Sequence, residues 1–264
     1  MIIKEYVKLR KTELKEEFAN IKQPIKFVIV QLNEDPASNA YIKGKLKDAN
    51  ELGVNAVLIK FPTSISEEDL LSEIDLLNKD SSVTGFIVQM PLPKQINEEH
   101  IKLAIDPKKD VDGFHPLSKL NPCTPQGIMN YLDFEHIELV GKNAVVIGRS
   151  NIVGKPMARM LLDRSANVTV LHSKTTKEDM HRYIENADIV VVAVGKKYLL
   201  DNSFKYKETA IIVDVGINRD ENGLCGDAIN NLPVKLQTPV PGGVGLLTRI
   251  ALYENLLKIV KGEN

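Results

Sequence analysis

The chain has 264 residues, of which 43% are hydrophobic and 26% are charged, and its formal net charge is −1. These values are ordinary for a globular protein with room for two domains, and the balanced charge offers no basic surface of the kind that binds nucleic acid. Two cysteines, without further ligands at metal-binding spacing, predict neither a disulfide framework nor a metal site.

The sequence gives no sign of a membrane segment. Its first residues, MIIKEYVKLRKTELKEEF, are charged throughout, which is unlike a signal peptide or an anchor. No apolar run approaches the roughly 20 residues that span a bilayer. We therefore expect a soluble, cytoplasmic protein.

The first half of the chain alternates apolar runs with helical stretches. Continuous apolar runs predict strands that are covered on both faces, at 26–32, 55–61 and 85–90. Helices are expected between them, over 38–52 and 66–79. Ser66 is the expected cap of the second helix, where acidic residues follow at the positive helix end.

A second series of strands is expected at 143–148, 167–172, 188–195 and 210–216. The proline-rich stretch FHPLSKLNPCTPQG separates the two series, and a helix is expected after it with Thr124 as cap and Pro125 in the first turn. Strands that alternate with helices predict parallel sheets, so the fold class is α/β with two domains. A final amphipathic helix, LLTRIALYENLLKIV, is expected to return to the first domain.

One stripe of the first expected helix carries an unusual set of side chains. Ser38, Tyr41 and Lys45 are spaced by three and four residues, which places them on one face. Taken alone, the stripe favours a capped amphipathic helix whose tyrosine packs on the domain. Gln89 ends a buried strand, at the edge where open α/β sheets carry their ligands, although a loop role is the commoner one there.

The stretch AVVIGRSNIVGKPMARMLL reads as a strand, a glycine-marked turn and a helix. Gly148 and Gly154 stand where a dinucleotide fold needs close backbone approach, but the pattern departs from G-x-G-x-x-G. The next strand ends in Ser173 and Lys174 without a carboxylate, and Arg149 follows the first glycine. These residues favour NADP over NAD because they would accept a 2′-phosphate; the alternative is that the two cations are solvated surface charges.

Several motifs occur together and in a fixed order between about residues 33 and 245. They are S-x-x-Y-x-x-x-K at 38–45, VQMPLP, KDVDGFHP, PCTPQG, GRSNIVGKPM, DVGIN and TPVPGGVG. In this combination the chain closely resembles the methylenetetrahydrofolate dehydrogenase/cyclohydrolase family. The resemblance implies NADP-dependent oxidation of 5,10-methylenetetrahydrofolate, followed by hydrolysis of the methenyl product to 10-formyltetrahydrofolate.

The resemblance also implies roles for individual residues. The implied catalytic residues are Lys45, Tyr41 and Gln89, and the implied folate contacts are Ser38, Tyr41, Asp112, Pro241, Gly242 and Gly243. The implied NADP contacts are Gly148, Arg149, Ser150, Ser173 and Ile217. No metal is implied.

The resemblance implies an arrangement of domains as well. Residues 1–120 and 246–264 would form the α/β folate-binding catalytic domain, and residues 121–245 a Rossmann-like NADP-binding domain. The partners would be a small folate and a second copy of the chain in a homodimer, with no nucleic acid and no membrane. The setting would be one-carbon metabolism and purine biosynthesis.

Two departures from the family pattern concern the folate pocket. The segment 113–122 is short, and Leu246–Arg249 replaces the Pro-Met-Thr that commonly follows the glycine turn. Tyr-x-x-x-Lys also occurs in short-chain dehydrogenases, but their glycine loop precedes it. A shikimate-dehydrogenase-like enzyme and a catalytically silent folate or NADP binder are the remaining alternatives. Cys123 has no partner base at a fixed spacing and is expected to be structural.

Overall fold

The computed structural model describes residues 3–221 and 223–263, and these form two compact units. One unit consists of Lys8–Cys123 together with the chain from Arg249 onward, and the other consists of Thr124–Thr248 together with the chain up to Val7. Three helices contribute to both units: α1 (Ile3–Ala19), α5 (Cys123–Phe134) and α8 (Val244–Lys261). Residues 1–2 and 264 of the expected first domain lie outside the described residues.

The unit that contains Lys8–Cys123 is built on a parallel three-stranded sheet in the order β2-β1-β3. Its strands are β1 (Lys26–Gln31), β2 (Asn55–Lys60) and β3 (Gly85–Val88), and its further helices are α2 (Pro36–Leu52), α3 (Glu67–Lys79) and α4 (Glu98–Ala104). All three predicted strands are confirmed. Ser66 also caps α3 as predicted, because its side chain accepts the N–H of Asp69.

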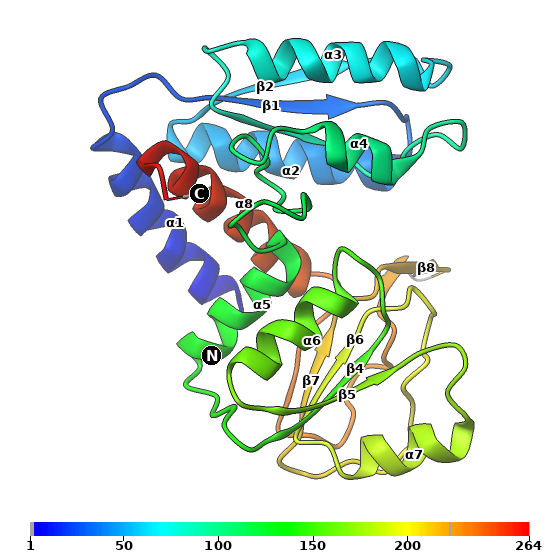
Figure 1. Ribbon diagram of the computed structural model, residues 1–264. Coiled ribbons are helices and arrows are strands. Elements are labelled where there is room, and N and C mark those ends of the chain that lie inside the picture. Colours follow the sequence, from blue (N-terminus) through cyan, green and yellow to red (C-terminus); the bar gives the residue numbers. More distant parts are fainter. Residues whose placement is uncertain (1–2, 222, 264) are drawn as a thin grey trace. The chain divides into compact units, whose positions relative to one another are not determined.

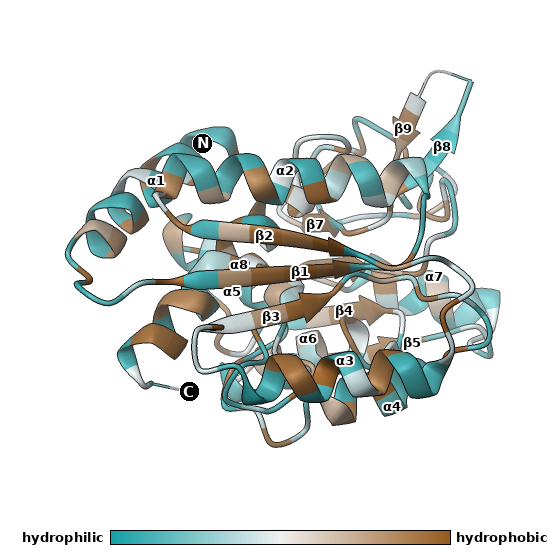
Figure 2. Ribbon diagram, turned by 90° about the horizontal axis from the view of Figure 1, so that it is seen from above, coloured by the Kyte–Doolittle hydropathy of each residue, from teal (hydrophilic) through white to brown (hydrophobic). Residues whose placement is uncertain are grey.

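Helices cover both faces of this sheet, and Figure 1 shows α3 on one side and α2 on the other. Alternate residues of β1 point to opposite faces. Val28 and Val30 belong to the core under α3 and α4. On the other face, the ring centroids of Phe27 and of Tyr253 in α8 lie 6.1 Å apart. Figure 2 shows the resulting hydrophobic strands between helices with hydrophilic outer faces. A sheet covered in this way leaves only its strand ends open to a ligand.

The second unit contains a parallel five-stranded sheet in the order β10-β7-β6-β4-β5. The strands are β4 (Asn143–Ile147), β5 (Asn167–Leu171), β6 (Ile189–Val192), β7 (Ile211–Asp214) and β10 (Leu236–Gln237). Helices α5 and α6 (Gly154–Asp163) pack on one face, and α7 (Lys177–Glu185) packs on the other. The order of strands reverses between β4 and β6, which is the point where a doubly wound fold opens a crevice for its ligand.

The last helix returns to the first unit, as predicted, since α8 from Arg249 onward belongs to it. Within that unit α8 pairs with α1 through Arg10 Nε and Glu254 Oε1, 2.9 Å apart. The prediction of an amphipathic helix is wrong, however, because all residues from Ile250 to Leu257 are buried. Two polar residues, Glu254 and Asn255, are among these buried residues.

Several elements differ from the sequence-based expectation. Helix α5 begins at Cys123, so Thr124 lies inside its first turn, and its hydroxyl lies 3.0 Å from that of Thr248 instead of capping the helix. Helix α1 and the hairpin of β8 (Asn218–Asp220) and β9 (Gly223–Cys225) were not predicted. Among the described residues, no helix has the length and apolar character needed to cross a membrane.

Candidate active site

Helix α2 places the predicted catalytic side chains, and its beginning is fixed by local chemistry. Asp35 is the cap, with its Oδ2 accepting the backbone N–H of Ser38 at 2.8 Å, and Pro36 occupies the first turn. Gly53 ends the helix in the left-handed conformation, with φ of 76°. The stripe predicted from sequence faces the interior, because Ser38 and Lys45 are buried and Tyr41 is half-buried.

Lys45 and Gln89 are brought together as predicted. The Lys45 ammonium nitrogen Nζ donates to Gln89 Oε1 at 3.0 Å, and it lies 5.1 Å from the centre of the Tyr41 ring. Gln89 follows β3 directly, and its backbone N–H donates to Val30 O of β1 at 2.8 Å. The order β2-β1-β3 reverses between β1 and β3, so Gln89 stands at the switch point of its own sheet.

The surroundings of Lys45 favour its uncharged form. Burial lowers the pKa of Lys45, and Arg249 acts in the same direction, whereas Asp112 and Cys123 oppose the shift. The exposed fraction of Lys45 is only 4%, so water contributes little to stabilising an ammonium there. Lys45 therefore gives up its proton more readily than a lysine in water, and a lowered pKa of this kind is a property of general acid–base residues.

The segment KDVDGFHP contains two aspartates, Asp110 and Asp112, with different surroundings. Asp110 is buried, and its carboxylate accepts the backbone N–H groups of Gly113 at 3.0 Å and His115 at 2.7 Å, which is a structural role. Asp112 is half-buried, and its carboxylate accepts no hydrogen bond from the described part of the chain. Burial raises the pKa of Asp112, and Lys45 opposes that shift. Asp112 is thus the aspartate available to a ligand.

Cys123 has the structural role that the sequence predicted. Its thiol is buried and donates to Val111 O at 3.4 Å, and Asn255 Nδ2 lies 3.5 Å from the sulfur. Burial and the neighbouring Asp112 raise the pKa of Cys123. A thiol that holds its proton in this way is a poor nucleophile.

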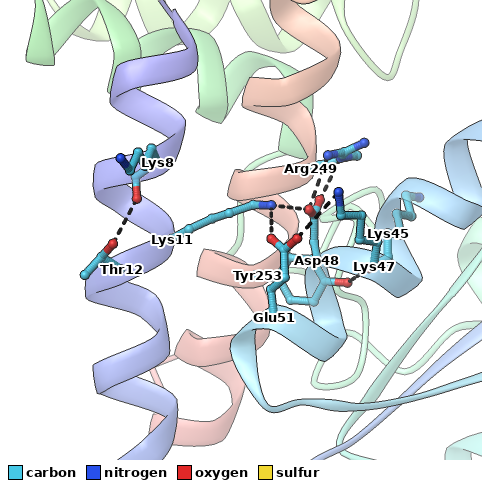
Figure 3. A network of polar contacts seen from close by, with 9 residues as sticks. All are labelled: Lys8, Lys11, Thr12, Lys45, Lys47, Asp48, Glu51, Arg249 and Tyr253. Carbon is cyan, nitrogen blue, oxygen red and sulfur yellow. Dashed lines mark hydrogen bonds and ion pairs between the residues drawn. The ribbon is translucent and has the colours of Figure 1, made fainter.

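A buried ionic cluster beside Lys45 was missed by the sequence analysis (Figure 3). Asp48 is fully buried and forms ion pairs with Arg249 and Lys11, and Lys11 also donates to Glu51 at 2.6 Å. Asp48 continues the stripe of Ser38, Tyr41 and Lys45 by one further turn, which is a signal that spacing could have revealed. Its partner Arg249 lies 201 positions away, and no spacing rule connects them.

The predicted nucleotide loop lies in the other unit, at the switch point between β4 and β6. Gly148 has φ of 122°, and a Cβ there would lie 2.4 Å from Ala193 O, so only glycine fits. A Cβ at Gly154 would lie 2.3 Å from Gly148 O. Ser150 Oγ accepts the N–H groups of Val153 and Gly154, both at 3.2 Å, and so orders the loop at the start of α6.

The remaining predicted cofactor residues are exposed around this loop. Arg149 and Ser173 are exposed, and Ile217 has an exposed fraction of 58%. The turn after β5 is held by the backbone N–H of His172, which donates to Thr175 Oγ1 at 3.0 Å. No carboxylate occupies residues 172–175, so the chemistry of the turn fits a phosphate better than a ribose hydroxyl.

Pro241, Gly242 and Gly243 form a turn in the same unit as the nucleotide loop. The Val240–Pro241 peptide bond is cis, and Gly242 has φ of 93°. A Cβ at Gly243 would lie 2.2 Å from Pro239 O, so the turn is tightly folded. Their predicted contact with folate stays a prediction. Among the described residues no cluster of three or more His, Cys, Asp or Glu side chains has the geometry of a metal site.

Models of two protein families match the chain. Residues 2–112 match the catalytic domain of tetrahydrofolate dehydrogenase/cyclohydrolase, and residues 122–264 match the NAD(P)-binding domain of the same enzymes. A curated relative from Streptococcus thermophilus, named bifunctional protein FolD, is 43% identical and covers 95% of this chain and 94% of its own length.

Solved structures give the same result. The bifunctional methylenetetrahydrofolate dehydrogenase/cyclohydrolase from Campylobacter jejuni is 40% identical, with a TM-score of 0.93, over 98% of this chain and 97% of the other. The enzyme from Trypanosoma brucei, solved with NADP and an inhibitor, is 29% identical, with a TM-score of 0.92, over 98% and 96% of the two chains. A shikimate dehydrogenase from Aquifex aeolicus, 17% identical with a TM-score of 0.55, shares the fold alone.

Proposed function

The chain belongs to the tetrahydrofolate dehydrogenase/cyclohydrolase family, and we propose that it oxidises 5,10-methylenetetrahydrofolate with NADP and hydrolyses the 5,10-methenyl product to 10-formyltetrahydrofolate. The observation that carries this proposal is the pair of buried Lys45 and half-buried Gln89, whose Nζ and Oε1 atoms are 3.0 Å apart beside the Tyr41 ring. An acid–base group and an aromatic surface at one sheet edge suit a planar substrate that must gain and lose protons.

The oxidation requires little chemistry from the chain itself. The methylene carbon of the substrate lies between two nitrogens, and their lone pairs stabilise the cation that remains when a hydride departs. NADP, when bound, supplies the acceptor for that hydride. The contribution of the protein is to hold the reacting groups in position, and positioning alone accounts for a large part of the barrier in such reactions.

The hydrolysis requires a proton acceptor and then a proton donor. Water attacks the methenyl carbon and loses a proton, and the ring nitrogen takes up a proton as its bond to that carbon breaks. A neutral Lys45 amine accepts the first proton and, as an ammonium, returns it to the leaving nitrogen. The lowered pKa of Lys45, caused chiefly by burial, makes this exchange easier than it would be for a lysine in water. Gln89 Oε1 accepts from Nζ and fixes the direction of the amine.

Folate recognition follows from the groups around Lys45. The half-buried ring of Tyr41 offers a face for stacking with the pterin, and the Asp112 carboxylate offers two acceptors to its N–H groups. Ser38 supports this face of α2. Pro241, Gly242 and Gly243 would provide further folate contacts; their assignment rests on family resemblance.

The residues of the nucleotide loop fit NADP. The cradle at Gly148 and Gly154 has no room for a Cβ, and α6 begins directly after it. Arg149, Ser150 and Ser173 would hold phosphate groups, and Ile217 would contact the cofactor from the β7–β8 connection. In this assignment residues 1–120 and 246–264 form the folate domain, and residues 121–245 form the NADP domain.

We further propose that the protein acts in the cytoplasm as a homodimer and supplies 10-formyltetrahydrofolate to purine biosynthesis. The support for these three statements is family resemblance.

The first test is kcat/KM for 5,10-methylenetetrahydrofolate oxidation by the purified protein, with NADP and NAD compared under the same conditions. We expect a clear preference for NADP. Ser173→Asp places a carboxylate where the 2′-phosphate is expected, so it should lower kcat/KM for NADP and leave that for NAD unchanged. A preference for NAD would refute the interpretation of the β5 turn, and absence of turnover with either cofactor would refute the proposed function and favour a silent binder or another substrate.

A further inference from the structure

The buried ion pair between α2 and α8 touches the turn of α2 that carries Lys45. Arg249 Nε lies 2.7 Å from Asp48 Oδ2, an ion pair without hydrogen-bond alignment, and Arg249 Nη2 donates to Asp48 Oδ1 at 3.2 Å. Asp48 is completely inaccessible to solvent, and only a fifth of the Arg249 side chain is exposed. A pair held this far from water keeps one geometry, because separating it would leave a buried charge without a partner.

Gly44 explains how the guanidinium comes so close to the helix. A Cβ built on Gly44 would lie 2.2 Å from Arg249 Nη1, so the guanidinium occupies the space of the missing side chain. Glycine in a helix interior is less favourable for helix formation than alanine. At this position the glycine admits Arg249 directly beside Lys45, which is the next residue in α2.

A second residue of α8 contacts the same turn. The Tyr253 hydroxyl donates to the backbone carbonyl of Lys45. Arg249 and Tyr253 are four residues apart and therefore lie on one face of α8. Helix α8 thus contacts this turn of α2 at two points: Arg249 packs on Gly44 and pairs with Asp48, and Tyr253 bonds to the carbonyl of Lys45.

We propose that Arg249, locked onto Asp48 and packed over Gly44, is a positioning residue that holds the Lys45 amine in place for the hydrolytic step. The inference rests on the proposed role of Lys45 in that step. Lys11 also pairs with Asp48 and donates to Glu51 at 2.6 Å. Of the two cations that pair with Asp48, Arg249 is the one that packs over Gly44, next to Lys45.

The fixed cation also acts on the proton equilibrium of Lys45. Burial is the main cause of the lowered pKa of Lys45, and the positive charge of Arg249 lowers that pKa further. The titratable and charged groups around Lys45 come from its own helix, from the segment after β3, from the start of α5 and from α8: they are Tyr41, Asp48, Asp112, Cys123, Arg249 and Tyr253. Among them Arg249 is the only cation, so its removal should raise the pKa of Lys45.

The test compares both reaction steps in Arg249→Met and Arg249→Lys, with Arg159→Met on an exposed helix face as the control for loss of an arginine. Rates of hydrolysis are followed as disappearance of the methenyl substrate over a pH series, after subtraction of the rate without enzyme. In Arg249→Met we expect kcat for hydrolysis to fall about 10-fold to 100-fold, with a smaller loss in oxidation. The acid limb of the hydrolysis profile should move to higher pH, because Lys45 must lose its proton to accept one from water.

Arg249→Lys restores a cation and should return the acid limb to its wild-type position. If Arg249→Met does not fold, this variant and Gly44→Ala still provide the test. Gly44→Ala should displace the guanidinium and reduce hydrolysis although alanine favours the helix. In the Gly44→Ala/Arg249→Met double variant the space is vacant, so the alanine should cause no further loss.

Three results would overturn the proposal: an unshifted acid limb in the folded Arg249→Met variant, equal losses in the two steps, or additive losses from Gly44→Ala and Arg249→Met. Failure of the proposed function gives a different pattern, since the wild-type protein would then show no turnover at all. Failure of the proposed role of Lys45 alone would leave hydrolysis intact in Lys45→Met.

Discussion

Replacement of Gly148 by alanine should damage the nucleotide-binding unit in two separable ways. Its φ of 122° is strained for any residue with a Cβ, which costs about 1–3 kcal/mol. The new Cβ would also lie 2.4 Å from the backbone oxygen of Ala193, which cannot move without disturbing the end of β6. Overpacking of this kind costs about 1–3 kcal/mol. We therefore expect a free energy of unfolding about 2–6 kcal/mol lower in Gly148→Ala.

Gly141 offers a matched control. It has φ of 70°, but a Cβ there would meet no atom within 4 Å, so Gly141→Ala carries the backbone cost without the collision. Urea unfolding followed by circular dichroism is suitable, because the chain has no tryptophan. Isothermal titration calorimetry with NADP should show weakened binding only in Gly148→Ala. Equal stability of the two variants, together with wild-type NADP affinity in Gly148→Ala, would refute the argument from close approach.

Three further predictions concern other parts of the molecule. Tyr41→Phe should keep KM for the folate substrate within about twofold, whereas Tyr41→Ala should raise it about fivefold through loss of stacking; equal effects in steady-state assays would exclude the ring as the contact. Ser66→Ala removes the cap of α3 and should lower the free energy of urea unfolding by about 1 kcal/mol without changing activity; an unchanged unfolding midpoint would contradict this. Burial raises the pKa of Asp214 from 3.8 to about 6, so its contribution to stability is present below about pH 4 and is lost as the pH rises to about 6. Relative to Asp214→Asn, the wild-type protein should lose roughly 3 kcal/mol across that range, and parallel urea-midpoint profiles would refute the shift.

The strands could be predicted because burial on both faces leaves a continuous apolar run, as in β1 and β4, whose cores are almost inaccessible to solvent. Helix α1 was not predicted because many charged residues surround its buried apolar residues, which include Tyr6, Leu14 and Phe18. The strands of the β8–β9 hairpin have only three residues each, too few for a period to appear.

For the site, spacing placed Tyr41 and Lys45 on one helix face, and family resemblance supplied Gln89 as the partner of Lys45. The pairing of Asp48 with Arg249 could not be predicted, because it depends on α8 returning to the unit that contains α2. The role of Gly44 could not be predicted from the sequence for the same reason, because Arg249, which packs against it, comes from the other end of the chain.

The central claim is that Lys45 acts in hydrolysis as an acid–base group and is dispensable for hydride transfer. Its most direct test is the rate of both steps in Lys45→Met, with Lys43→Met, an exposed lysine of the same helix, as control. We expect hydrolysis to fall about 10²-fold to 10⁴-fold, while oxidation falls much less and Lys43→Met resembles the wild type. Equal loss of both steps in Lys45→Met, with folate binding intact, would contradict the claim.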